Sequence, residues 1–129
     1  MKGGNMKKIL IIDDEIDFTD VLSKRLFKSG FNIITANSGI EGINKAKQEK
    51  PDIILLDINM PDKDGLHVFK DIRKNEETQE IPIIIISGIA DEEEITTMSL
   101  AMGINPEDII IKPFETKSLI DKINKTLNI

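Results

Sequence analysis

The chain has 129 residues, of which 40% are hydrophobic and 31% are charged, a balance typical of one globular domain. Its net charge is −6, so phosphate backbones repel its surface and direct nucleic-acid binding is not expected. The sequence has no cysteine, which excludes disulfides and a cysteine nucleophile, and no apolar stretch approaches the roughly 20 residues that span a membrane.

The start of the chain lacks the apolar segment of a secretory signal. We therefore expect residues 1–6 to form a flexible leader and residues 7–129 to form one domain. The lack of cysteine is compatible with a reducing cytosol, and neither a nucleic-acid partner nor a membrane partner is expected.

Short apolar runs alternate with segments of helical period. The runs cover residues 7–12, 31–35, 52–56, 82–86 and 108–111. Four of them are apolar nearly throughout, as expected for parallel strands that are covered on both faces. The more polar run at 31–35 is expected at an edge of the sheet.

Helical periodicity follows each of the runs. The apolar stripe of the first helix consists of Phe18, Val21, Leu22 and Leu26. Ser38 and Glu41 match a capping box at the start of the second helix, and Asp91 is placed to begin the fourth. The apolar residues that mark the third, fourth and fifth helices are Leu66, Phe69, Ile72, Ile95, Met98, Met102, Leu119, Ile120, Ile123 and Leu127.

Strands and helices thus alternate five times. Right-handed connections then give an α/β fold of the doubly wound (βα)5 type, an open five-stranded parallel sheet with helices on both faces. The carboxyl ends of such strands share one edge of the sheet, where ligands bind. The polar residues at or just past these ends are Asp13, Asp14, Asp57, Ser87 and Lys112.

The three acids of this set predict a metal site. Asp13, Asp14 and Asp57 would lie close together if the first and third strands are neighbours. Their repulsion would raise at least one pKa unless a cation intervenes. Mg²⁺, with Mn²⁺ as a substitute, fits because it prefers oxygen ligands and bridges to phosphate. A strand-terminal aspartate can also cap a helix, and Asp14 could do so for a helix that begins near Glu15.

The same edge carries groups that suit phosphoryl transfer. Asp57 can act as a nucleophile toward phosphorus and form an acyl phosphate. Lys112 can neutralise a phosphoryl oxygen, and the hydroxyl of Ser87 can donate to another. Taken alone, Ser87 is more simply a strand-end hydroxyl and Lys112 a solvated lysine. Pro113 stiffens the turn after the lysine and Phe114 can pack back on the core, which argues against the solvated lysine.

With these residues in view, the chain resembles the response-regulator receiver domain of two-component signalling, and chemotaxis-type single-domain receivers are nearest in form. The resemblance covers about residues 6–127. Its motifs are weak singly but highly specific in this order and spacing. They are Asp13-Asp14, Asp57, Met60-Pro61-Asp62-Lys63-Asp64-Gly65, Ser87-Gly88 and Lys112-Pro113-Phe114.

The resemblance implies a flavodoxin-like receiver fold with strand order 2-1-3-4-5. It also implies that Asp57 is the phospho-acceptor. Asp14, Asp57 and the backbone carbonyl of Asn59 would ligate Mg²⁺, and Asp13 would hold a water bound to the metal.

The resemblance further implies a switch. Ser87 would be the switch hydroxyl, Gly88 the small residue that keeps the phosphoryl group accessible, and Lys112 the partner of that group. Receivers usually carry an aromatic residue three positions before the lysine, where this chain has Ile109. The aromatic rotamer change therefore cannot occur as such. The segment at 103–108 also looks longer than usual.

As a receiver, the protein would be a cytoplasmic signalling module rather than an enzyme acting on a separate substrate. It would take a phosphoryl group from a sensor histidine kinase or a phosphotransfer protein and lose it by Mg²⁺-assisted hydrolysis. The change would alter the surface of helix 4, strand 5 and helix 5, which binds a downstream effector protein.

Three other functions fit parts of the pattern. Phosphatases of the haloacid-dehalogenase kind also use an aspartyl phosphate, but they need an acid two residues after the nucleophile, where this chain has Asn59. A flavodoxin-like cofactor binder needs a phosphate-cradling loop and aromatic walls, whereas this chain has acids after the first strand and no Tyr or Trp. A scaffold that has lost phosphorylation would not need all five polar residues of the edge.

Overall fold

A computed structural model describes residues 6–60, 65–88 and 91–129. Most of the predicted leader and the segment 61–64 of the predicted loop motif lie outside these residues. The five strands form one parallel sheet in the order β2-β1-β3-β4-β5, which confirms the expected topology. Their bounds are β1 Lys8–Ile12, β2 Asn32–Ala36, β3 Ile53–Asp57, β4 Ile83–Ser87 and β5 Ile109–Ile111.

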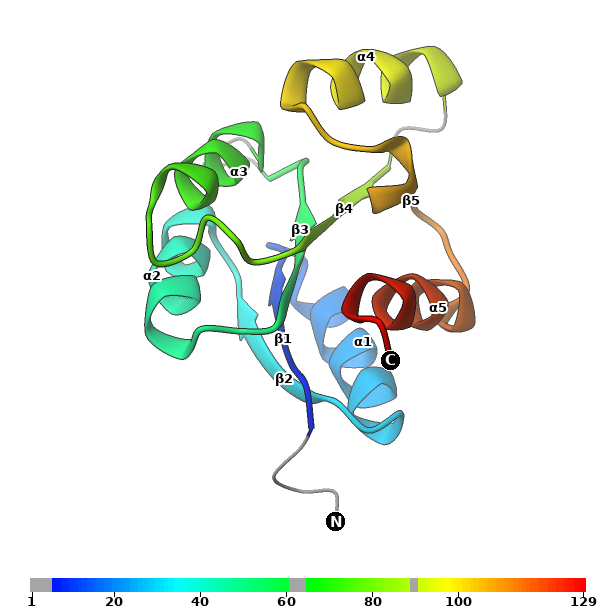
Figure 1. Cartoon of the computed structure of the whole chain (residues 1–129). Coiled ribbons are helices and arrows are strands. Elements are labelled where there is room, and N and C mark those ends of the chain that lie inside the picture. Colours follow the sequence, from blue (N-terminus) through cyan, green and yellow to red (C-terminus); the bar gives the residue numbers. More distant parts are fainter. Residues whose placement is uncertain (1–5, 61–64, 89–90) are drawn as a thin grey trace.

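Within the described ranges, five α-helices cover the sheet. Figure 1 shows α1 and α5 on one face of the sheet and α2 and α3 on the other, with α4 farther out beyond β4 and β5. Their bounds are α1 Ile16–Lys28, α2 Gly39–Glu49, α3 Gly65–Lys74, α4 Glu92–Met102 and α5 Thr116–Leu127. None of the helices in the described ranges is long and apolar enough to cross a membrane.

Apolar side chains of the strands fill two cores, one on each face of the sheet. Neighbouring residues of a strand point to opposite faces, so each all-apolar strand feeds both cores. Toward α2, α3 and α4 the two central strands β1 and β3 send Leu10, Ile12, Ile54 and Leu56. Toward α1 and α5 they send Ile9, Ile11, Ile53 and Leu55. All eight are fully buried, and burial of each contributes roughly 1.5–3 kcal/mol.

Strand β2 lies at an edge of the sheet, as its polar sequence predicted. Lys45 covers part of this edge, because its Nζ donates to the carbonyl of Thr35 at 2.6 Å. A lysine at this place discourages pairing with a further strand. The capping box is also present: Ser38 Oγ accepts from the Glu41 N–H at 3.1 Å, and Glu41 Oε1 accepts from the Asn37 N–H at 2.8 Å.

Helix α1 differs from its predicted apolar stripe at one position. Val21 is 50% exposed, and Thr19 is buried beside Leu22 and Leu26 instead. The Thr19 hydroxyl donates to the carbonyl of Glu15 at 2.8 Å, so its burial leaves no polar group unsatisfied. The prediction for Val21 was wrong because a threonine whose hydroxyl is hydrogen-bonded within its own helix can occupy a buried position.

The segment before β5 contains a short 3-10 helix, η2, which spans Pro106–Asp108. Asn105 begins it, with its side-chain oxygen accepting from the Glu107 N–H at 3.1 Å. Lys122 of α5 donates to the Glu107 carbonyl at 2.7 Å. The extra residues noted in the sequence are therefore part of an ordered turn that is tied to α5.

The contact between α2 and β1 predicts the effect of one substitution. A Cβ added at Gly42 would lie 2.6–2.8 Å from three side-chain atoms of the fully buried Ile12. Isoleucine is stiff at χ1, so this overpacking outweighs the helix preference of alanine. We expect Gly42→Ala to lower the free energy of unfolding by about 1–2 kcal/mol in urea denaturation. Asn44→Ala, on the exposed side of the same helix, should change it by less than about 0.5 kcal/mol, and a Gly42→Ala protein as stable as wild type would contradict this packing.

Candidate functional site

Three acids meet where β1 and β3 end. The two strands are neighbours, with Ile12 opposite Leu56, so the residues that end or follow them are brought together. Asp13, Asp14 and Asp57 each offer a carboxylate oxygen, and these oxygens lie within 4.8 Å of one another. Asp13 and Asp57 are buried, whereas Asp14 is partly exposed. The predicted acid cluster is confirmed.

Lys112 reaches into this cluster from the end of β5. Its Nζ lies 3.3 Å from Oδ2 of Asp13 and 3.9 Å from Oδ2 of Asp57. The same atom lies 2.8 Å from Oε1 of Glu15. The backbone N–H of Lys112 donates to the carbonyl of Ser87 at 2.8 Å, which holds the lysine beside the end of β4. Its side chain is only 20% exposed, so it is not a solvated lysine.

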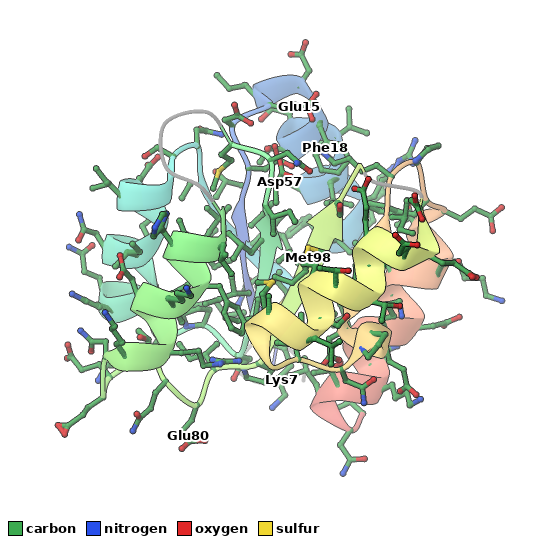
Figure 2. The ribbon with its side chains drawn as sticks, turned by 90° about the horizontal axis from the view of Figure 1, so that it is seen from above. Lys7, Glu15, Phe18, Asp57, Glu80 and Met98 are labelled. Carbon is green, nitrogen blue, oxygen red and sulfur yellow. The ribbon has the colours of Figure 1, made fainter. Side chains whose placement is uncertain are left out.

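Two aromatic rings support the lysine. The Nζ of Lys112 lies 4.2 Å from the centroid of the Phe18 ring, a distance at which the ring face attracts a cation. Phe18 meets Phe114 edge to face with centroids 6.0 Å apart. Phe114 packs back on the α1 and α5 core, as predicted, after the cis peptide bond between Lys112 and Pro113. Figure 2 shows Phe18, Glu15 and Asp57 at one end of the molecule, with Lys7 and Glu80 at the other.

Local turns fix the direction of both buried carboxylates. Asp13 Oδ1 accepts from the backbone N–H of Glu15 at 2.9 Å, and Asp57 Oδ1 accepts from the backbone N–H of Asn59 at 3.0 Å. Aspartate commonly forms this bond to the residue two positions on. In each aspartate the second oxygen, Oδ2, is left to face Lys112.

Burial changes the proton affinity of the cluster. Loss of solvent raises the pKa of Asp13 from 3.8 to about 6; the bond from the Glu15 N–H opposes this rise and the charge of Asp57 adds to it. A raised pKa was predicted, but burial contributes more than the repulsion on which the prediction rested. Burial alone would lower the pKa of Lys112. The hydrogen bond to Glu15 and the charges of Asp13 and Asp57 outweigh that effect and raise it.

A pocket of about 520 Å³ opens over the acids. The residues that line it are Asp14, Glu15, Asp57, Asn59, Gly88 and Lys112. The loops after β3 and β4 meet at its wall, where Asn59 Oδ1 accepts from the Gly88 N–H at 3.4 Å. In the part of the chain that the structure describes, a Cβ at Gly88 would meet no atom within 4 Å apart from its chain neighbours, so this position leaves the pocket open.

Three predicted site residues lie outside the pocket wall. Asp13 is fully buried within the acid cluster. Ser87 is fully buried at the end of β4, beneath the pocket. Ile109 is buried too, and it packs in the α2, α3 and α4 core with Met102 rather than beside the acids. In β5 it lies opposite Ile85 of β4.

Glu15 is a site residue to which the sequence analysis assigned no role. Helix α1 begins at Ile16, so Glu15 rather than Asp14 is its N-cap residue, and the Glu15 side chain makes no cap hydrogen bond. The alternative in which Asp14 caps this helix is not observed. The sequence did contain a signal for this ion pair. Glu15 is a third consecutive acid after Asp13 and Asp14, at the same edge of the sheet as Lys112.

The donor set of the cluster could hold a metal ion. Three carboxylates within 4.8 Å supply oxygen ligands, which suit hard divalent cations. The loss of solvent that raises the pKa of Asp13 shows that a charged carboxylate is costly there, and a cation would offset that cost.

Known proteins resemble the chain over nearly its whole length. The family model for the response regulator receiver domain matches residues 9–124. A probable transcriptional regulator of Guillardia theta, ycf27, is 36% identical over 121 residues. The match covers 94% of this chain and 45% of that protein, so the chain spans less than half of the relative's length.

Solved structures of similar proteins share the fold. A response regulator from Desulfuromonas acetoxidans is 30% identical, with a TM-score of 0.82 and coverage of 95% of this chain and 97% of that one. A CheY-like receiver domain protein from Methanospirillum hungatei is 29% identical, with a TM-score of 0.83 and coverage of 96% and 95%. The chemotaxis response regulator CheY4 of Vibrio cholerae is 27% identical, with a TM-score of 0.83 and coverage of 94% and 98%.

The raised pKa of Asp13 predicts how stability depends on pH without divalent cations. Between pH 3.8 and about 6 the folded protein keeps a proton that the unfolded chain has lost, so this residue destabilises the fold as pH rises through that window. We expect Asp13→Asn to raise the free energy of unfolding at pH 7.5, in EDTA, by about 1–3 kcal/mol. In urea denaturation the gain should vanish near pH 4. Asp20→Asn, an exposed acid of α1, should show no such pH dependence, and a gain for Asp13→Asn that is equal at both pH values would contradict the prediction.

The acid cluster also predicts stabilisation by a cation. An ion that binds the folded state alone raises its stability, by about 1.4 kcal/mol when its concentration is ten times the dissociation constant. We expect millimolar Mg²⁺ to raise the Tm of the wild-type protein at neutral pH. The rise should be lost in Asp57→Ala and kept in Asp20→Asn, and an equal rise in all three proteins would place the bound ion elsewhere.

Proposed function

The chain belongs to the response regulator receiver domain family of two-component signalling, and we propose that it accepts a phosphoryl group on Asp57. The observation that carries the proposal is the geometry around this buried carboxylate. Oδ1 of Asp57 is held by the Asn59 N–H, while Oδ2 faces the ammonium of Lys112 at 3.9 Å. Asp57, Asn59 and Lys112 also line the same pocket, through which a phosphoryl donor would approach.

The proposed reaction is a direct displacement at phosphorus. A carboxylate oxygen of Asp57 attacks the phosphorus atom, and the bond from phosphorus to the donor's leaving atom breaks. The leaving atom is a histidine nitrogen of a sensor kinase or phosphotransfer protein, or an acetate oxygen when the donor is acetyl phosphate. The leaving group departs with the electron pair, and Asp57 becomes an acyl phosphate. Attack by water on that phosphorus later breaks the bond from phosphorus to the Asp57 oxygen, which releases inorganic phosphate and restores the carboxylate.

We propose Mg²⁺, or Mn²⁺ in its place, as the ion of the acid cluster. Asp14, Asp57 and the backbone carbonyl of Asn59 would hold it directly, and Asp13 would hold it through a water. When bound, the ion supplies positive charge to the phosphoryl oxygens. In this proposal the cation also offsets the cost of burying the charge of Asp13.

The remaining pocket residues would hold the product. The acyl phosphate brings about −1.5 to −2 charges at neutral pH, and Lys112 is placed to neutralise part of them. The Ser87 hydroxyl would donate to a phosphoryl oxygen after moving up from its buried position at the end of β4. Gly88 leaves room for the group, because among the described residues other than its chain neighbours no atom lies within 4 Å of where its Cβ would be.

The proposed output is a change of the surface formed by α4, β5 and α5. Ile109 of β5 is buried against Met102 of α4, so the path from the site to this surface runs through aliphatic side chains. Met98 also packs against that core, and Figure 2 shows it on the side of α4 that faces the sheet. The partner of the changed surface would be a downstream effector protein.

In this proposal the protein is a signalling receiver rather than an enzyme for a separate substrate. It catalyses its own phosphorylation and the loss of its own phosphoryl group. The proposed location is the cytoplasm, as expected for a receiver of two-component signalling.

Intact mass spectrometry tests the proposal directly. The protein is incubated with Mg²⁺ and acetyl phosphate, in parallel with Asp57→Asn and with wild type in EDTA. We expect wild type with Mg²⁺ to gain the mass of one phosphoryl group and to lose it with time after the donor is removed. The Asp57→Asn protein should gain none, and the EDTA sample much less. A folded wild type that gains nothing, or an equal gain in Asp57→Asn, would refute Asp57 as the acceptor.

A further inference from the structure

Glu15, and not Asp57, is the closest charged partner of Lys112. The Lys112 Nζ lies 2.8 Å from Glu15 Oε1, against 3.3 Å from Asp13 Oδ2 and 3.9 Å from Asp57 Oδ2. Glu15 stands on the α1 side of the pocket, directly before the first residue of the helix. The ammonium is therefore drawn toward α1 and away from the carboxylate that would carry the phosphoryl group.

The backbone of Glu15 is fixed independently of its side chain. Its N–H donates to Asp13 Oδ1 at 2.9 Å, and its carbonyl accepts from both the N–H and the hydroxyl of Thr19, at 3.0 and 2.8 Å. The side chain makes no cap hydrogen bond to α1. Its contact with Lys112 can therefore be removed while the backbone bonds that shape the site remain.

The lysine cannot serve Glu15 and a phosphoryl group equally well. An ammonium has three N–H donors, and those of Lys112 already face the carboxylates of Glu15 and Asp13 and the ring of Phe18. A phosphoryl group on Asp57 Oδ2 needs at least one of these donors turned toward it. The Glu15 carboxylate also lines the pocket, where its negative charge opposes an anionic donor.

We propose that Glu15 is a positioning residue that holds Lys112 on the α1 side of the pocket until a phosphoryl group competes for it. The inference rests on the proposed function of Asp57 as acceptor. Glu15 thus restrains phosphoryl capture: without its carboxylate, Lys112 is free to turn toward Asp57, and capture is faster at a given donor concentration.

The first test needs no phosphorylation. The side-chain ammonium signals of ¹⁵N-labelled protein are recorded by NMR at low temperature, and the Lys112 signal is assigned by its loss in Lys112→Arg. We expect the Lys112 ammonium protons of the unphosphorylated wild type to be protected from exchange with water and to give a sharp signal. In Glu15→Gln we expect this signal to be shifted or broadened. Asp17→Asn, which removes an exposed acid from the first turn of the same helix, should leave the signal unchanged. A Lys112 signal that is identical in wild type and Glu15→Gln would overturn the proposed contact.

The second test measures the rate of phosphoryl capture from acetyl phosphate with Mg²⁺, by intact mass. Glu15→Gln keeps the shape of the side chain and removes its charge. Glu15→Asp keeps the charge but shortens the side chain, so that it no longer reaches Lys112 at contact distance. Since Glu15 is 63% exposed, we expect about a 2- to 5-fold faster capture in both variants and no change in Asp17→Asn.

The outcomes separate contact from general charge. Faster capture in Glu15→Gln alone, with Glu15→Asp equal to wild type, would mean that Glu15 acts only by repelling the donor, and it would overturn the proposal. Unchanged capture in both variants would overturn it too. If wild type itself takes up no phosphoryl group, the proposed function of Asp57 fails, and the NMR comparison still decides whether Glu15 holds the lysine.

Discussion

The structure depends on one arrangement, in which two carboxylates are buried side by side at the end of the sheet. The strand order makes β1 and β3 neighbours, so Asp13 and Asp57 cannot avoid each other. Two like charges out of water cost free energy unless a positive group accompanies them. Lys112 supplies such a group, with its Nζ within 4 Å of both, and this need explains why a lysine at the end of β5 turns inward.

The hydrophobic cores are what make this arrangement rigid. β1, β3 and β4 are buried on both faces, so the residues at their ends have little freedom to move apart. The turns after β1 and β3 then fix one oxygen of each aspartate through a backbone N–H. The floor of the pocket is thus formed by the buried strand ends, and its walls are formed by loops. Rigid strands suit a site that must place one carboxylate oxygen accurately.

The sequence predicts the strands and the common edge because all-apolar runs that end in polar residues have few other interpretations. It placed each strand start one residue early. It also ended β3 and β4 one residue early, since hydrophobicity does not reveal that Asp57 and Ser87 still belong to these strands. The burial of Thr19 in place of Val21 depends on a hydrogen bond within the helix. The pair between Glu15 and Lys112 joins residues 97 positions apart, and only side-chain geometry decides which of the nearby acids lies closest to the lysine.

The face toward which Ser87 points determines what its proposed movement can affect. Side chains alternate along β4, so Ser87 shares the face of Ile85, which packs in the same core as Ile109 and Met102. A hydroxyl that rises toward a phosphoryl group therefore leaves space on the α4 side of the sheet. Ile109 is stiff at χ1 and has no ring to rotate into that space. Methionine has three rotatable bonds and adapts readily. Met102 and Met98 of α4 belong to or pack against this core, so α4 carries side chains suited to follow the proposed movement of Ser87. In the proposed switch, the adaptable side chains would therefore belong to α4, the helix proposed to carry the output, rather than to β5.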